Sequence, residues 1–105
     1  MARLTADAAA QFDALLDYYM ERNRDDAIRR LRVALGEALT KIDTVPDGGR
    51  TFPGPYRGIG HWPYRWIKVH RYWFAYAVEG GDSVITNIFF ESADIENRLQ
   101  PPPAG

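Results

Sequence analysis

The sequence of 105 residues contains no cysteine. Disulfide bonds, catalytic thiolates and cysteine-based zinc sites are therefore excluded. No apolar run approaches the ~20 residues that span a bilayer, and the first residues lack the layout of a signal peptide. These absences favour a cytoplasmic protein without membrane association. The length allows one small domain, which we expect over residues 1–99, followed by a disordered proline-rich tail over 100–105.

Acidic residues are missing from one long window. Between Arg50 and Val78 there is no Asp or Glu, although the window holds five Arg or Lys residues, both histidines and nine of the fourteen aromatic residues. Thirteen basic and fourteen acidic residues nevertheless give the chain a formal charge of -1. Attraction to an anionic partner must therefore come from this uneven distribution. The window suits either RNA or an acidic protein surface.

Two amphipathic helices are predicted in the first half of the chain. Apolar residues recur at helical spacing between Ala8 and Tyr19, and Thr5 is a suitable N-cap. A second apolar face begins at Ile28 and ends before the Pro and Gly residues of 46–49. The short polar turn between the two segments predicts an antiparallel helical hairpin, whose apolar stripes cover a common surface.

The second half is predicted to form a connecting loop and three antiparallel strands. Residues 46–63 contain five Gly and four Pro, too many for a regular element. Alternation with a period of two then predicts strands over 64–70, 72–79 and 83–91, and the Gly80-Gly81-Asp82 turn supplies the positive φ angles of a tight hairpin. The predicted fold class is therefore α+β, with the helical hairpin on one face of the sheet.

The alternation also assigns residues to the two faces of this sheet. Tyr72, Phe74 and Tyr76 are expected to face the helices. Trp73, Ile85 and Phe89 are expected on the opposite face, where they are candidates for an exposed partner surface. The alternative is that the connecting loop or the C-terminal segment covers them.

The order and spacing of four segments carry a resemblance to a known family. They are Ala8 to Phe12 with Leu15, Leu16 and Tyr19; Pro46 with Gly49-Arg50; Arg71 to Val78; and Ile88 to Ile95. Over about Arg3 to Leu99 the chain resembles the RelE/ParE superfamily of toxins from type II toxin-antitoxin systems. The Asp-Ile pair near its end and the well-matched helices are closer to the ParE branch. The resemblance implies a short N-terminal strand and a helical hairpin packed on a three- to four-stranded antiparallel sheet.

A ParE-like protein acts, by this resemblance, as a toxin that binds and poisons DNA gyrase. It is neutralised by a cognate antitoxin, whose C-terminal segment docks as an amphipathic helix and an added strand. The expected state is thus a hetero-oligomer with the antitoxin, with no cofactor and no sequence-specific contact with nucleic acid. A non-toxic relative that serves only as a binding module remains a further alternative.

The RelE branch offers a second function, a ribosome-dependent messenger RNA endoribonuclease. Lys68, His70 and Arg71 would be its catalytic candidates, because several cations must converge on one phosphate. Trp73, however, stands where such enzymes carry a mid-strand arginine, and carboxylates follow from Glu91 onward. A carboxylate would repel a scissile phosphate by roughly 1 to 4 kcal/mol at ~4 Å. Action by binding, without enzymatic activity, is therefore expected.

The predicted partner-binding site combines apolar anchors with basic side chains. Its apolar anchors are the outer-face residues Trp73, Ile85 and Phe89. Its charges for an acidic partner would come from Arg65, Lys68 and Arg71. No metal site is expected, because His61 and His70 have no third ligand near them in the sequence.

Overall fold

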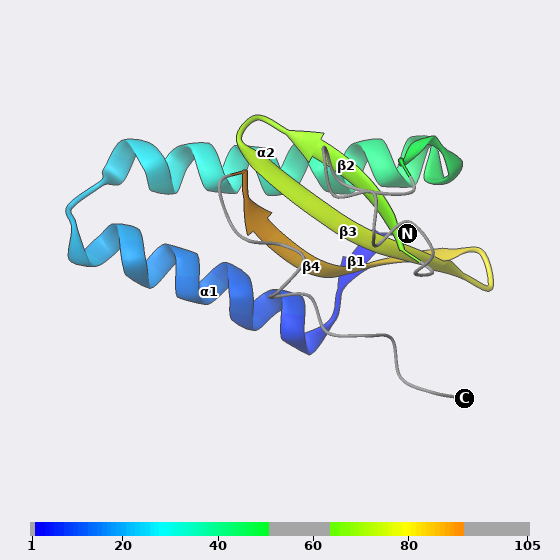
Figure 1. Cartoon of the computed structure of the whole chain (residues 1–105), viewed down its shortest axis with the longest axis horizontal. Helices are drawn as coiled ribbons and strands as arrows, with labels where there is room; N and C mark the ends of the chain where they lie inside the picture. Colours follow the sequence, from blue (N-terminus) through cyan, green and yellow to red (C-terminus); the bar gives the residue numbers. More distant parts are fainter. Residues whose placement is uncertain (1, 51–63, 92–105) are drawn as a thin grey trace.

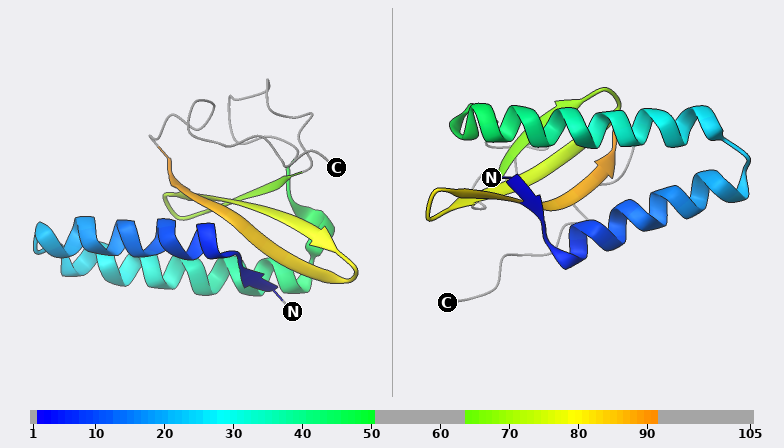
Figure 2. Two further views of the ribbon diagram at one scale, coloured as in Figure 1. Left: turned by 90° about the horizontal axis from the view of Figure 1, so that it is seen from below. Right: turned by 180° about the vertical axis from the view of Figure 1, so that it is seen from behind.

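The computed structural model describes residues 2–50 and 64–91. Its elements follow the order β1 (Ala2–Leu4), α1 (Ala6–Glu21), α2 (Asp25–Thr44), η1 (Pro46–Gly48), β2 (Arg65–Val69), β3 (Tyr72–Glu79) and β4 (Asp82–Phe90). The helices form one layer and the sheet the other, as Figures 1 and 2 show. This arrangement confirms the predicted α+β class. Residues 51–63 and 92–105, which include His61 and the expected tail, lie outside the described residues.

The sheet has four strands in the order β1-β4-β3-β2. The pairs β2/β3 and β3/β4 are antiparallel, as predicted. The expected N-terminal strand is present but pairs parallel to β4, through Ala2 with Ser83 to Leu4 with Ile85, so the sheet is mixed. Parallel neighbours need a long connection between them, and here both helices and two strands provide it.

Local sequence signals account for both helices. The Thr5 side chain accepts a hydrogen bond from the Ala8 amide at 3.1 Å, which confirms the predicted N-cap of α1. The hairpin turn includes Asn23 at φ 54°, a left-handed conformation that Asn adopts more readily than most residues. Asp25 and Asp26 then lie in the first turn of α2, where the helix dipole favours negative charge.

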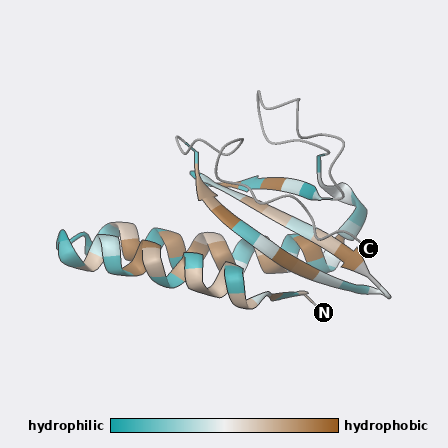
Figure 3. Ribbon diagram, turned by 60° about the horizontal axis from the view of Figure 1, so that its bottom comes forward, coloured by the Kyte–Doolittle hydropathy of each residue, from teal (hydrophilic) through white to brown (hydrophobic). Residues whose placement is uncertain are grey.

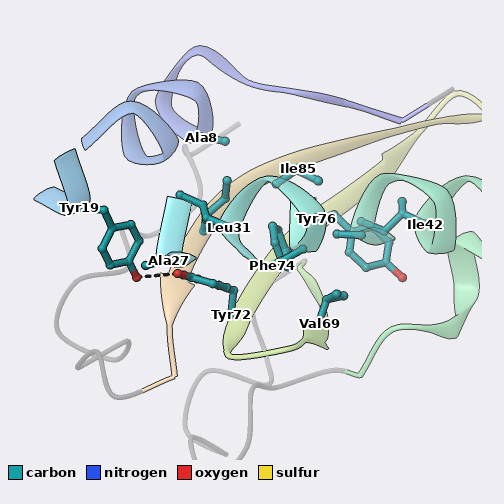
Figure 4. Close-up of a cluster of buried hydrophobic side chains, with 13 residues drawn as sticks. Ala8, Tyr19, Ala27, Leu31, Ile42, Val69, Tyr72, Phe74, Tyr76 and Ile85 are labelled. Carbon is teal, nitrogen blue, oxygen red and sulfur yellow. Dashed lines mark hydrogen bonds between the residues drawn. The ribbon is translucent and has the colours of Figure 1, made fainter. Parts of the chain in front are cut away.

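The core lies between the helices and one face of the sheet. Leu31 and Ile42 of α2 are almost fully buried against Phe74 and Tyr76 of β3 (Figure 4). The prediction that Tyr72, Phe74 and Tyr76 face the helices is confirmed. The Tyr76 hydroxyl donates a hydrogen bond to the Pro46 carbonyl at 2.7 Å and so holds the end of α2 against the sheet.

A β-bulge in β4 corrects one prediction. Ala75 pairs with Asn87, but the next residue, Tyr76, pairs with Ile85, so Thr86 is an extra residue in β4. An extra residue reverses the side-chain alternation beyond it. Ile85 therefore belongs to the helix-facing core and is fully buried, contrary to its predicted place on the outer face.

The helical hairpin extends past the end of the sheet. Figure 1 shows the tip between α1 and α2 projecting beyond the β2–β3 turn. In Figure 3 this tip is hydrophilic, whereas hydrophobic bands follow β3 and β4. Within residues 2–50 and 64–91, neither α1 nor α2 offers the long apolar stretch that crossing a bilayer would require.

Candidate partner-binding site

Trp73 and Phe89 lie on the outer face of the sheet, as predicted, but they are not exposed. Trp73 is 7% exposed and Phe89 is 5% exposed. Phe89 stacks on Trp66, with 6.4 Å between the ring centroids. Together with the burial of Ile85, this removes all three predicted apolar anchors from the accessible surface. A partner must therefore use other apolar residues.

Basic residues gather where β2 turns into β3 and where β4 ends. The Glu91 carboxylate accepts a hydrogen bond from Arg71 Nε at 2.8 Å and lies 3.0 Å from Lys68 Nζ. The interactions with Arg71 and Lys68 hold the pKa of the Glu91 carboxyl below its usual value. Lys68 also lies 6.0 Å from the centroid of the Trp73 ring. One carboxylate is thus shared by two of the predicted site cations.

The other predicted cations do not join this cluster. Arg65 is 3.8 Å from the Asp47 carboxylate, near the opposite end of β2. His70 Nε2 lies 3.2 Å from a Glu37 oxygen on α2. His70 has φ 56°, so the two-residue β2–β3 turn uses a histidine in the left-handed region, where non-glycine residues are uncommon. The structure therefore brings Lys68 and Arg71 together, with His70 beside them, but leaves Arg65 apart.

A second shared carboxylate lies at the start of α2. Asp26 accepts hydrogen bonds from Arg24 and Arg30. The hydrogen bond from Arg24 is the largest cause that lowers the pKa of Asp26 to about 2. Each of the two carboxylates, Asp26 and Glu91, is therefore paired with two basic side chains.

A groove of about 710 Å³ opens between α1 and the last residues of β4. Ala14, Leu15 and Tyr18 line it from the helix, and residues 88–90 line it from the strand. Tyr18 is 51% exposed, with the Arg22 guanidinium 3.7 Å from its ring centroid. Sequence reasoning missed this groove, since it assigned Leu15 to the helical core face and expected the partner surface of the last strand on its outer face, at Ile85 and Phe89.

Gln11 is the polar residue of the groove that sequence reasoning missed. Its side-chain oxygen accepts a hydrogen bond from the Ile88 amide at 2.7 Å. The available signal was a glutamine four residues before Leu15, which places its long polar side chain beside an apolar helical stripe. The groove thus offers apolar surface and a strand edge. Among the described residues, no three His, Asp or Glu side chains gather as a metal site.

Comparisons with known proteins agree with this fold. Residues 2–91 match the family model described as ParE toxin of type II toxin-antitoxin system, parDE. The chain is similar to a solved structure titled "Chromosomal ParDE TA system from P. aeruginosa", with a TM-score of 0.55 and 18% identity, over 85% of this chain and 92% of that chain. At this identity the likeness shows the fold alone. No curated protein matches the chain.

Proposed function

Because this chain belongs to the ParE toxin family of type II toxin-antitoxin systems, we propose that it binds and poisons DNA gyrase and that a cognate antitoxin neutralises it. The family match over residues 2–91 is the observation that carries the proposal. A toxin-antitoxin pair of this kind implies a protein partner, and the groove beside α1 is a surface that such a partner could cover. Gyrase acts on chromosomal DNA, so this action would take place in the cytoplasm and needs no cofactor from the toxin.

The basic cluster supports action by binding over cleavage of RNA. A ribonuclease of the RelE type needs cations that converge on one phosphate. Here Lys68 and Arg71 both face Glu91, and His70 faces Glu37. A phosphate placed between the two cations would meet the Glu91 carboxylate, and the repulsion is roughly 1 to 4 kcal/mol at ~4 Å. The proposed toxin therefore acts by binding to its target and not by cleaving RNA.

Induced expression tests this proposal in cells. We expect growth arrest with induction of the DNA-damage response while protein synthesis continues, because trapped gyrase leaves broken DNA. Rapid translation arrest without DNA damage would instead support the endoribonuclease. In that case Lys68→Ala should abolish the arrest, whereas under the proposed function it should leave the type of response unchanged. Unimpaired growth at confirmed expression would support the non-toxic binding module.

A further inference from the structure

A small pocket of about 60 Å³ opens where the helical hairpin meets the β2–β3 turn and the end of β4. Apart from Ala27, each residue that lines it carries an aromatic ring or a basic group: Tyr19, Tyr72, Phe90, Arg30, His70 and Arg71. Within residues 2–50 and 64–91, no Asp or Glu lines this pocket. Basic groups around a pocket without carboxylates favour an anionic ligand.

The two tyrosines leave one hydroxyl proton without an acceptor. Their hydroxyl groups point toward each other, with 2.5 Å between the oxygens (Figure 4). Two hydroxyls carry two protons, and the bond between them uses only one. In the described part of the chain, neither hydroxyl has another hydrogen-bond partner. Tyr19 and Tyr72 are both at least nine-tenths buried, so a ligand in the pocket that accepted this proton would satisfy a donor that is shielded from solvent.

Two guanidinium groups lie near this donor. Burial and then the hydrogen bond to Tyr19 raise the pKa of Tyr72, so its hydroxyl keeps its proton at neutral pH. Arg30 and Arg71 shift the same pKa in the opposite direction, because their positive charges act on this hydroxyl. The Arg71 guanidinium also lies 4.9 Å from the centroid of the Phe90 ring, which is another wall of the pocket. A hydroxyl donor and two positive charges thus surround one small space.

Both arginines keep N–H groups for a ligand. A guanidinium has five N–H donors. Arg71 uses Nε for Glu91, and Arg30 uses Nε and Nη2 for Asp26. Among residues 2–50 and 64–91, Nη1 of Arg30 and both terminal nitrogens of Arg71 donate to no acceptor. An anion could therefore bind both side chains without breaking their ion pairs.

The carboxylates around the pocket leave a positive surplus. Asp26 is paired with two bases, and Glu91 with two others. Four bases minus two acids leave two positive charges. Glu37, which lies beside His70, lowers the surplus to one while His70 is neutral and leaves it at two when His70 is protonated. The local charge thus favours an anion in either state of the histidine.

From these observations we propose that the pocket binds one phosphate group, either free or at the end of a larger ester. One phosphate oxygen accepts the spare tyrosine proton, and Arg30 and Arg71 bind other oxygens. A tetrahedral phosphate offers oxygens in more directions than a planar carboxylate, and arginine suits phosphate well. The volume admits only a few heavy atoms. The rest of an ester must therefore lie in the adjoining groove, which shares Tyr19 and Phe90 with the pocket.

Titration of the full-length protein with sodium phosphate, followed by ¹H–¹⁵N NMR at constant ionic strength, measures this binding. The backbone amides of Arg71 and Phe90 should show saturable shifts that give one Kd. The amide of Val33, an exposed α2 residue that does not line the pocket, should not move. Sodium acetate should bind at least about tenfold more weakly, because it offers only two oxygens.

The source of the phosphate group is tested with thymidine 5′-monophosphate and thymidine. Tighter binding of the monophosphate than of inorganic phosphate would identify the terminal phosphate of an ester as the ligand. Equal or weaker binding would identify free phosphate. Thymidine alone, which has no phosphate, should leave the Arg71 and Phe90 amides unshifted.

Substitutions of charged residues test the contacts. Arg30→Gln and Arg71→Gln each remove a charge-assisted donor and should weaken phosphate binding at least about tenfold. Arg32→Gln removes the same charge from an exposed α2 position outside the pocket lining and should change Kd less than about twofold. Glu91→Gln removes a negative charge beside Arg71 and should tighten binding at least about twofold.

Tyrosine variants test the spare proton. In Tyr19→Phe or Tyr72→Phe the remaining hydroxyl still has one proton to donate, so phosphate affinity should stay within about threefold of the wild type. The double variant has no such proton. It should bind phosphate roughly 12- to 160-fold more weakly, the equivalent of one hydrogen bond to a charged group. Unchanged amide positions away from the pocket would verify that the double variant keeps its fold.

Three results would each overturn the inference: acetate that binds as tightly as phosphate, wild-type affinity in Arg71→Gln, and wild-type affinity in the folded double tyrosine variant. The gyrase assay is independent of all three. Inhibition of gyrase without phosphate binding would remove only this pocket's ligand. Phosphate binding without any effect on gyrase would remove only the proposed target.

Discussion

One buried hydrogen bond between Tyr19 and Tyr72 joins the helical hairpin to the sheet. The two hydroxyl oxygens are 2.5 Å apart, and the residues are 9% and 3% exposed (Figure 4). Replacing either tyrosine by phenylalanine leaves the other hydroxyl without its partner, which should lower the free energy of unfolding by about 1 to 3 kcal/mol. Replacing both removes both polar groups and keeps both rings. The double variant should therefore lose less stability than the sum of the two single variants.

Urea unfolding of the wild type, both single variants and the double variant at neutral pH measures this coupling. With an m value of roughly 1 to 2 kcal/mol per molar urea, each single variant should lower the midpoint by about 0.5 to 3 M. Losses that add within error would refute the reasoning, because they would show that neither hydroxyl depends on the other.

The same pair predicts an alkaline effect. Burial and then the hydrogen bond to Tyr19 raise the pKa of Tyr72 above its ordinary value of about 10. The unfolded chain therefore releases this proton at a lower pH than the folded protein. Stability from Tyr72 is complete below about pH 10 and declines as the pH rises above it. Thermal unfolding between pH 8 and 11 should show a shallower decline for Tyr72→Phe than for the wild type.

Three further substitutions test the fold and the basic cluster. Gly49→Ala should lower stability by about 1 to 3 kcal/mol, seen as a lower Tm, because its Cβ would lie 2.5 Å from the Tyr76 hydroxyl and 2.9 Å from Arg65 Cβ. The control is Gly36→Ala in α2, where an added Cβ would have nothing within 4 Å, and this variant should raise Tm. Equal effects of the two substitutions on Tm would contradict the close packing at Gly49. Thr5→Ala should cost about 1 kcal/mol in urea unfolding through loss of the α1 cap, and no change would argue against that cap. The lowered pKa of Glu91 means that its stabilising contribution is present above about pH 4.5 and lost as the pH falls. Glu91→Gln should thus flatten the acid decline of Tm between pH 7 and 3, and an unchanged profile would mean that the ion pairs contribute nothing.

Much of the fold could be predicted because its signals are local. The period of the apolar residues gave both helices, Thr5 marked a helix start, and the glycines at 80 and 81 marked a hairpin. The two glycines do adopt positive φ angles, 55° and 87°. The face of β3 also followed from simple alternation, since the bulge lies in the neighbouring strand.

The candidate site was less predictable because it depends on non-local contacts. The extra residue Thr86 has no distinctive local signal, yet it moves Ile85 into the core. Lys68 and Arg71 can both reach Glu91 only because the end of β4 lies beside the β2–β3 turn, about twenty residues earlier in the sequence. The groove likewise exists only because α1 lies beside the last residues of β4, which are far from it in the sequence. Sequence alone could supply the types of side chain at this site but not their pairing.

The most direct test of the proposed function is a reaction of purified gyrase with supercoiled DNA and this protein. We predict inhibited supercoiling together with accumulation of linear, protein-linked DNA that appears only when the protein is present. Unaffected gyrase together with cleavage of messenger RNA on translating ribosomes, abolished by Lys68→Ala, would contradict action by binding to gyrase and would establish the endoribonuclease in its place.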